Sequence, residues 1–272
     1  MTSEPYGGGK KLNNITFKII IPSILFSLIE VYPKKLVRGE DLDIFDFVYE
    51  TLGGGTYWFT SALAVAEIII VVIMMASKSR NVWFYVLICA ILSFLGSFDQ
   101  LTSQFLLCGY YLWAWGSGLT ALIFIVMGGV YYKYERRLII SWPVMVGLLL
   151  IWVASIHILC DDLKFTPFNR WLNIQGVVVG TLASFLLVCI CKKILYLRIL
   201  EYIGKNSIGF YFLSGGVPTI LSLLTNRMIG EPIMMGLVIV FIGSVIVSFA
   251  VVYILNRYLP FVFDLRKFSV KR

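Results

Sequence analysis

The pattern of hydrophobic and polar residues divides the chain into eight continuous apolar segments separated by polar links. A helix needs roughly 20 apolar residues to cross the hydrocarbon core of a bilayer, and these segments are close to that length. Apolar and polar residues do not alternate within them, so each segment predicts a membrane-spanning helix and not a strand of a β-barrel. The segments are 15–32, 57–76, 82–98, 112–132, 138–159, 174–191, 203–224 and 233–258.

The composition agrees with a membrane protein. Of the 272 residues, 59% are hydrophobic and 14% are charged, whereas soluble domains have about 45–50% and 25%. We therefore predict an all-α, polytopic transmembrane bundle of about eight helices. The sequence shows no boundary that would separate a second domain, so residues 1–272 are expected to form a single transmembrane domain.

Lysine and arginine residues are unevenly distributed between the two sets of alternate loops. Six of the 23 lie in one set, and the other seventeen lie in the second set and at the two ends of the chain. The six are Lys34, Lys35, Arg38, Lys164, Arg170 and Arg227. Because basic residues are retained in cytoplasmic loops, both termini are predicted to lie in the cytoplasm. The net charge of +8 is explained by these loops, so no nucleic-acid partner is expected.

Glycine residues mark three places where the backbone has special freedom. The longest outer loop, 33–56, is predicted to be a solvated connector with a short surface helix, and Gly53, Gly54 and Gly55 at its end indicate a flexible turn. The aromatic cluster that follows, Tyr57, Trp58 and Phe59, is typical of a membrane interface. The pairs at 128–129 and 215–216 allow close approach of helices or local unwinding.

Glu67 is the clearest candidate for function, since it lies near the middle of segment 57–76. An ionisable side chain inside a membrane is costly, and it usually faces the bundle interior or a water-filled cavity. Its carboxylate could bind a polar substrate or relay a proton. The alternative is a structural, protonated carboxyl group bonded to a neighbouring helix, and the sequence leaves both interpretations open.

His157 is the only histidine, and it lies near the outer end of segment 138–159, shortly before Asp161 and Asp162. A neutral imidazole can act as a general base toward a hydroxyl group, and a nearby carboxylate would orient it. The alternative is an interfacial histidine whose nitrogens bond to loop carbonyls. These residues do not supply the three or four ligands at defined spacing that a zinc site needs, so no metal is expected.

Three stretches of the sequence resemble motifs of the acyltransferase-3 family of membrane O-acyltransferases. Gly55-Thr56-Tyr57-Trp58-Phe59, followed by the helix that contains Glu67, is similar to the family's "YWFL…AL…E" helix. The stretch 200–211, LEYIGKNSIGFY, is similar to the family's segment "L-x-x-I-G-x-N-S-L-x-I-Y". The stretch 119–134 resembles another helix of the family, which ends in a basic cytoplasmic loop. The order and spacing of the three stretches agree over nearly the whole chain.

The resemblance implies a function and a set of site residues. Family members transfer an acyl group, often acetyl, from cytoplasmic acyl-CoA to a hydroxyl of an envelope polysaccharide or its lipid-linked precursor, in the bacterial cytoplasmic (inner) membrane. Acetyl-CoA, the glycan acceptor and the lipid bilayer are then the expected partners. The implied substrate-binding residues are Tyr57, Trp58, Asn206, Ser207 and Lys18. The implied catalytic candidates are Glu67 and His157.

The sequence also departs from the family's pattern. The first two family helices, which carry a histidine and an "F-x-x-S-G" segment, have no counterpart before Ile15, so the chain resembles an N-terminally shortened relative. A later family histidine is replaced by Ser214. Two hypotheses therefore stand: an acyltransferase with basic inner residues around an acyl-CoA entrance, or a non-catalytic polytopic protein such as a flippase-like transporter or an inactive partner.

Overall fold

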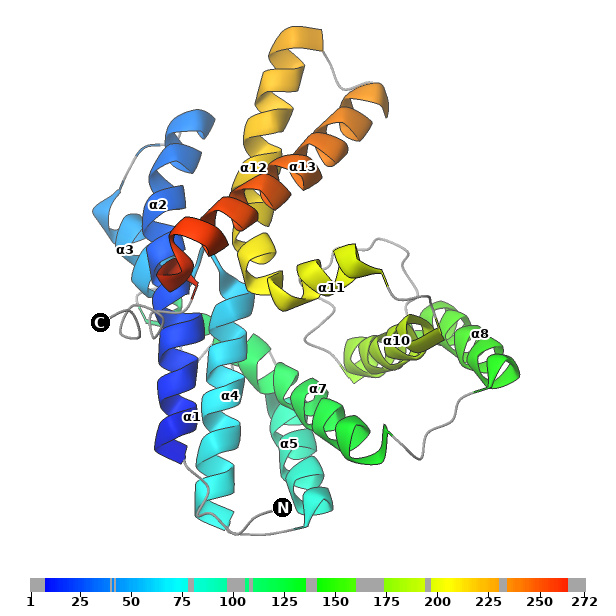
Figure 1. Cartoon of the computed structure of the whole chain (residues 1–272). Coiled ribbons are helices and arrows are strands. Elements are labelled where there is room, and N and C mark those ends of the chain that lie inside the picture. Colours follow the sequence, from blue (N-terminus) through cyan, green and yellow to red (C-terminus); the bar gives the residue numbers. More distant parts are fainter. Residues whose placement is uncertain are drawn as a thin grey trace. The chain divides into compact units, whose positions relative to one another are not determined.

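The structure is a computed structural model of the full chain (Figure 1). It describes residues 8–39, 41, 43–77, 81–96, 106–107, 110–135, 141–159, 174–193, 197–229 and 234–263. Each of the eight apolar segments forms a helix within these residues. By length and composition, five helical spans in the described part can cross a membrane, namely Gly8–Leu36, Trp58–Ser77, Trp115–Tyr134, Ser207–Thr225 and Gly236–Tyr258. The predicted all-α membrane bundle is thus confirmed.

Large apolar side chains on the outside of the helices explain why this fold needs lipid. Phe241 of α13 is 71% exposed, and Leu237 and Ile246 on the same helix are also exposed. Soluble monomers rarely expose such continuous apolar surface. The chain is therefore an integral membrane protein.

The chain divides into two compact units. The first unit comprises Met1–Leu12 and Trp58–Leu195, and the second comprises Asn13–Tyr57 and Tyr196–Arg272. Two compact units can belong to one domain, so the single transmembrane domain expected from the sequence stays a prediction.

The first unit contains α4 (Trp58–Ser77), α5 (Val82–Gly96), α7 (Trp115–Tyr134), α8 (Trp142–Leu159) and α10 (Ile174–Lys193). Helices α4 and α5 both pack against α7, and α8 packs against α10. Two short antiparallel strands, β1 (Leu106–Leu107) and β2 (Tyr110–Tyr111), pair Leu106 with Tyr111. They lead into a 3-10 turn, η2 (Leu112–Ala114), and α7 begins after it, three residues later than predicted.

Small residues permit the close approach of α4 to α7. An ideal Cβ on Gly118 would lie 2.8 Å from Val65 Cγ1 and 3.1 Å from the Ala62 carbonyl oxygen. Small residues at helix interfaces are typical of membrane proteins, because packing and not the hydrophobic effect holds such helices together. A core of Ala66, Ile70, Cys89 and Leu122 joins α4, α5 and α7. The pair Gly128–Gly129, by contrast, has no atom within 4 Å of its Cβ positions.

The second unit begins with one long helix that was predicted too short. It runs through α1 (Gly8–Ile15, shared between the units), a π-helical segment η1 (Thr16–Ile20) and α2 (Ile21–Arg38). The apolar pattern predicted an end at Tyr32, directly before Pro33. Pro33 is tolerated inside α2, and the helix ends where Gly39 adopts the left-handed conformation, with φ of 67°. The wide turn of η1 ends at Ile20, two residues before Pro22, which has no N–H to continue the ladder of helical hydrogen bonds.

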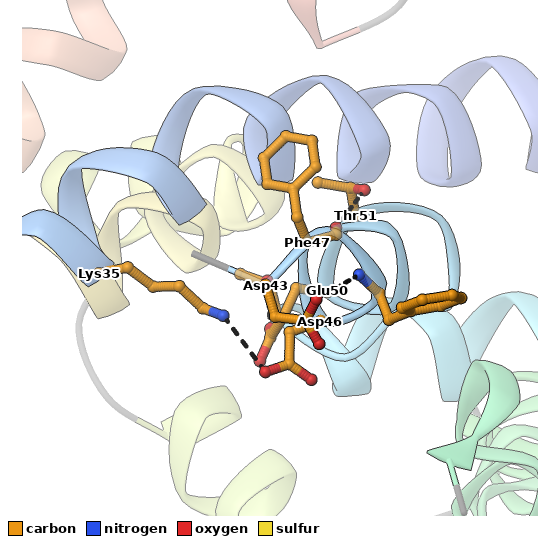
Figure 2. Close-up of polar contacts among 8 residues, drawn as sticks. Lys35, Asp43, Asp46, Phe47, Glu50 and Thr51 are labelled. Carbon is orange, nitrogen blue, oxygen red and sulfur yellow. Dashed lines mark hydrogen bonds and ion pairs between the residues drawn. The ribbon is translucent and has the colours of Figure 1, made fainter. Parts of the chain in front are cut away.

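The short helix expected in the loop 33–56 is α3 (Ile44–Leu52), and its side chains separate by character. Asp43 caps its first turn by accepting a hydrogen bond from the Phe45 N–H, and Asp46 forms a 3.7 Å ion pair with Lys35 of α2 (Figure 2). An apolar face of Ile44, Phe45, Val48 and Leu52 is exposed. The helix is therefore amphipathic, and α2 and α3 pack together.

The remaining helices of the second unit are α11 (Arg198–Lys205), α12 (Ser207–Ile229) and α13 (Met234–Tyr258), followed by the 3-10 turn η4 (Pro260–Val262). Helix α12 packs against both α13 and α2. The core of this unit consists of Phe26, Tyr57 and Phe212, and the rings of Phe26 and Phe212 are stacked with centroids 4.5 Å apart.

Candidate functional site

Glu67 of the first unit lies in the third turn of α4 and is half-buried. The ammonium group of Lys11 on α1 interacts electrostatically with its carboxylate. Helix α1 passes close to α4, since Gly8 lies against the thioether of Met75. The arrangement gives an intramembrane carboxylate with a cation from a neighbouring helix, which suits both of the roles considered for Glu67.

His157 lies in the last turn of α8, but its side chain is outside the described residues, as are Asp161 and Asp162. The proposed orientation of the imidazole by a carboxylate stays a prediction. Within the part of the chain that the structure describes, no group of three or more His, Cys, Asp or Glu side chains could hold a metal ion.

Glu30 of α2 and Tyr57 form the second polar site, in the other unit. The Tyr57 hydroxyl is bonded to Glu30 Oε2, and it lies 2.9 Å from the carbonyl oxygen of Phe212 in α12. Tyr57 is buried, and its ring packs edge-on against Phe212 with centroids 4.9 Å apart. Glu30 was not among the site residues predicted from the sequence. A second carboxylate inside a spanning helix was the available signal.

A hydrogen-bonded turn after α3 places Tyr57 in this site. Gly54 has a φ of 79°, and the N–H groups of Gly55 and Thr56 donate to carbonyl oxygens of Tyr49 and Glu50. The Thr56 hydroxyl also donates to Glu50 Oε2 at 2.6 Å. The glycine turn was predicted to be flexible, but here it is held to α3 by these bonds. It thereby directs the Tyr57 ring into the core of the second unit.

The other residues implied by the family resemblance lie at several places. Asn206 joins α11 to α12, and its Oδ1 accepts a 2.8 Å hydrogen bond from Asn256 of α13. Ser207, the first residue of α12, is exposed, as is Lys18 in η1. Trp58 is half-exposed at the start of α4 and meets the Phe59 ring edge-on. Asn206 therefore has a structural bond, whereas Ser207 and Lys18 are accessible.

The basic side chain of Lys192, near the end of α10, has partners within the first unit. Lys192 forms a 2.7 Å ion pair with Glu135 and lies 5.1 Å above the ring centroid of Tyr131. Its hydrogen bond to Glu135 raises the pKa of Lys192 above the ordinary value, and the one to Tyr131 adds to this shift. A persistently positive group therefore lies just beyond the apolar part of α10.

Among the comparisons with known proteins, the chain matches a family model. The model of the acyltransferase-3 family, described as an acyltransferase domain, matches residues 4–257. No curated protein and no solved structure matches the chain. The family match covers both carboxylate sites and every implied substrate-binding residue.

Proposed function

Because the chain belongs to the acyltransferase-3 family, we propose that it is a membrane-bound O-acyltransferase that transfers acetyl groups from acetyl-CoA to a hydroxyl group. The acceptor is an envelope polysaccharide or a lipid-linked sugar of a bacterium. The family match over residues 4–257 is the observation that carries this proposal. A membrane acyltransferase follows from the match and the apolar helices, and the donor, acceptor and acetyl specificity are our proposal.

The reaction requires a base and a site that the two substrates can both reach. The hydroxyl oxygen forms a bond to the thioester carbon, the carbon–sulfur bond breaks, and the hydroxyl proton ends on the CoA thiol. Glu67 is suited to accept this proton because it is half-buried in an apolar helix with Lys11 nearby. His157 is the second candidate for proton transfer. Tyr57, Trp58, Asn206, Ser207 and Lys18 are the proposed substrate-binding residues.

The proposed orientation determines the side from which each substrate arrives. In this orientation the chain lies in a bacterial inner membrane with both termini on the cytoplasmic side. Lys10, Lys11 and Lys18 then lie on the side that supplies acyl-CoA. Basic groups attract the phosphates of CoA. The glycan acceptor would then enter from the outer side or within the bilayer.

Acetylation of envelope glycan in cells that make the chain tests this proposal. Cells that lack glycan O-acetylation would express the chain, and alkali-released acetate from purified glycan would be measured after labelling with radioactive acetate. We expect release above that of cells without the chain, and a loss of roughly 100-fold or more for Glu67→Ala. Asp46→Asn serves as the control, because Asp46 lies on the loop helix α3 and its ion pair with Lys35 of α2 is long, at 3.7 Å.

An absence of glycan acetylation would contradict the proposal. If the chain is present in the membrane and the glycan carries no more releasable acetate than in cells without it, the enzyme hypothesis is wrong. The non-catalytic alternative, a flippase-like transporter or an inactive partner, would then be favoured.

A further inference from the structure

Helix α11 lies where α12 enters the membrane. A single residue, Asn206, separates the two helices, and the membrane-spanning part of α12 begins at Ser207. Asn206 also accepts a hydrogen bond from Asn256, which is near the end of the spanning helix α13. Figure 1 shows that α11 turns away from the axis of α12. Helix α11 is therefore at the membrane boundary, beside the ends of two spanning helices.

The side chains of α11 separate by character into two faces. Three charged residues recur at spacings of three and four, so they share one side of the helix, and they are Arg198, Glu201 and Lys205. Three apolar or aromatic residues have similar spacing on the opposite side, and they are Ile199, Tyr202 and Ile203. An amphipathic helix of this kind is typical of the interface between water and lipid.

Tyr202 shows in which direction the apolar face points. Its ring is stacked on that of Phe249 in α13, with centroids 5.9 Å apart, and it meets the ring of Phe210 in α12 edge-on at 6.3 Å. Phe210 lies about one turn after Ser207, and Phe249 lies more than two turns before Tyr258, where the α13 span ends. Both rings are thus within the spanning helices. The apolar face of α11 is therefore directed toward the core of the bilayer.

Two apolar side chains of α11 are largely uncovered in this position. Ile199 lies on the same face as Tyr202, one turn earlier, and is 65% exposed. Leu200, the next residue, is 55% exposed. At the boundary of a membrane, contact with acyl chains would remove their apolar surface from water, which is favourable.

Basic side chains lie at the level that lipid headgroups would occupy. Arg198 and Lys205 are both exposed on the charged face of α11. Arg257, in the last turn of α13, is also exposed, and its guanidinium group donates a 3.1 Å hydrogen bond to the Tyr253 hydroxyl. These three cations outnumber the one carboxylate of α11, Glu201, so this end of the unit attracts anions.

The exposed apolar residues distinguish a lipid from a free phosphate compound. An anionic phospholipid carries its phosphate group directly above acyl chains, and α11 carries its basic face directly above an apolar face. Free phosphate or CoA phosphates would contact the basic face alone and would leave Ile199 and Leu200 in water. The combination of the two faces therefore favours a phospholipid.

We propose that α11 is an interfacial helix that binds anionic phospholipids. Their acyl chains contact Ile199 and Leu200, and their headgroup phosphates contact Arg198 and Arg257. This inference goes beyond the proposed acyl transfer and does not depend on it, because it requires only that α12 and α13 span the membrane.

Reaction of introduced cysteines with a water-soluble maleimide tests the placement of α11. The purified full chain with Ile199→Cys or Lys205→Cys would be reconstituted in phospholipid vesicles. Label at the introduced position would be measured by mass spectrometry, relative to the label after denaturation in SDS. Lys205 is the matched control, because its side chain is 72% exposed and lies on the charged face of the same helix. Both positions are at the same membrane boundary, so their ratio does not depend on the orientation of the chain in the vesicles.

We expect position 199 to react roughly 10-fold or more slowly than position 205, because a thiol in apolar surroundings forms little thiolate. Leu200→Cys is the second reporter if Ile199→Cys does not fold. Equal rates at the two faces would overturn the interfacial placement. Protection of position 199 that disappeared when the chain was diluted with more lipid would indicate a second copy of the chain and would overturn the lipid assignment.

Thermal unfolding in mixed micelles tests the headgroup. Phosphatidylglycerol should raise the melting temperature of the full chain more than phosphatidylcholine with the same acyl chains. Arg198→Gln should reduce this advantage by about 2–4 °C. Glu201→Gln is the matched control on the same face, and it should enlarge the advantage, because it removes a negative charge and releases Lys205 from its ion pair.

Two results would show that α11 does not select anionic lipid. One is an advantage of phosphatidylglycerol that stays the same in Arg198→Gln and in Glu201→Gln. The other is an equal rise in melting temperature with inorganic phosphate in place of phosphatidylglycerol, which would assign the basic groups to a free phosphate compound.

Discussion

Substituting Gly118 by alanine tests the packing of α7 against α4. The added Cβ would lie 2.8 Å from Val65 Cγ1, 3.0 Å from Val65 Cβ and 3.1 Å from the Ala62 carbonyl oxygen. Val65 is buried and β-branched, so it has essentially one rotamer in a helix and cannot move aside. The Ala62 oxygen belongs to the backbone. The two helices must therefore separate locally.

The magnitude follows from comparison with Gly128→Ala on the same helix. The Cβ position of Gly128 has no atom within 4 Å, so alanine there is tolerated. Both substitutions gain about 1 kcal/mol or less from helix propensity. Only Gly118→Ala forces extra volume into a packed interface, which costs about 1–3 kcal/mol. The difference between the two variants in free energy of unfolding should therefore be about 1–3 kcal/mol.

Thermal unfolding of the purified full chain in detergent micelles measures this difference. At about 2–4 °C per kcal/mol for a chain of this size, Gly118→Ala should melt roughly 2–12 °C below Gly128→Ala. Equal melting temperatures, or a more stable Gly118→Ala, would refute the close packing of α4 and α7.

Two further predictions concern hydrogen-bonded pairs. Asn206→Ala should destabilise the chain by about 1–3 kcal/mol, because it removes both the acceptor for Asn256 and the donor to the Tyr202 carbonyl oxygen. Asn256→Ala removes only the shared bond, so the double variant should be little worse than Asn206→Ala alone; additive effects in thermal unfolding would contradict this coupling. The hydrogen bond to Glu135 raises the pKa of Lys192 in the folded chain. On the alkaline side, the stability that Lys192 gains from the pair is therefore retained up to the ordinary lysine pKa of 10.5, and it is lost as pH rises through the higher pKa of the folded chain. The melting-temperature advantage over Glu135→Gln should thus shrink when a neutral solution is made strongly alkaline, and an advantage that grew over this range would disprove the assignment.

The existence and type of the long helices could be predicted from the sequence, but several of their ends could not. Pro33 is a local stop signal, yet α2 continues to Arg38 and ends at the left-handed Gly39. The predicted start at Leu112 failed because Trp113 and Ala114 have positive φ angles, and α7 begins only after them. Local signals indicate where a helix can end, and the surrounding packing selects among them.

Glu67 was identified from the sequence because a single carboxylate in the middle of an apolar segment is conspicuous. Glu30 was not, since its importance depends on partners that are distant along the chain. Tyr57 follows it by 27 residues, and the Phe212 carbonyl lies 155 residues after Tyr57. An ideal Cβ on Gly216 would overlap Glu30 Oε1, so the need for a glycine there likewise depends on the position of Glu30.

The sequence alone determined that this chain is a helical membrane protein, because the length and continuity of apolar segments reflect the thickness and chemistry of the bilayer. Only the tertiary structure decided which polar groups meet inside each unit. Hydrogen bonds and steric overlap act over a few ångströms, so they depend on the relative placement of helices, which a one-dimensional pattern does not contain.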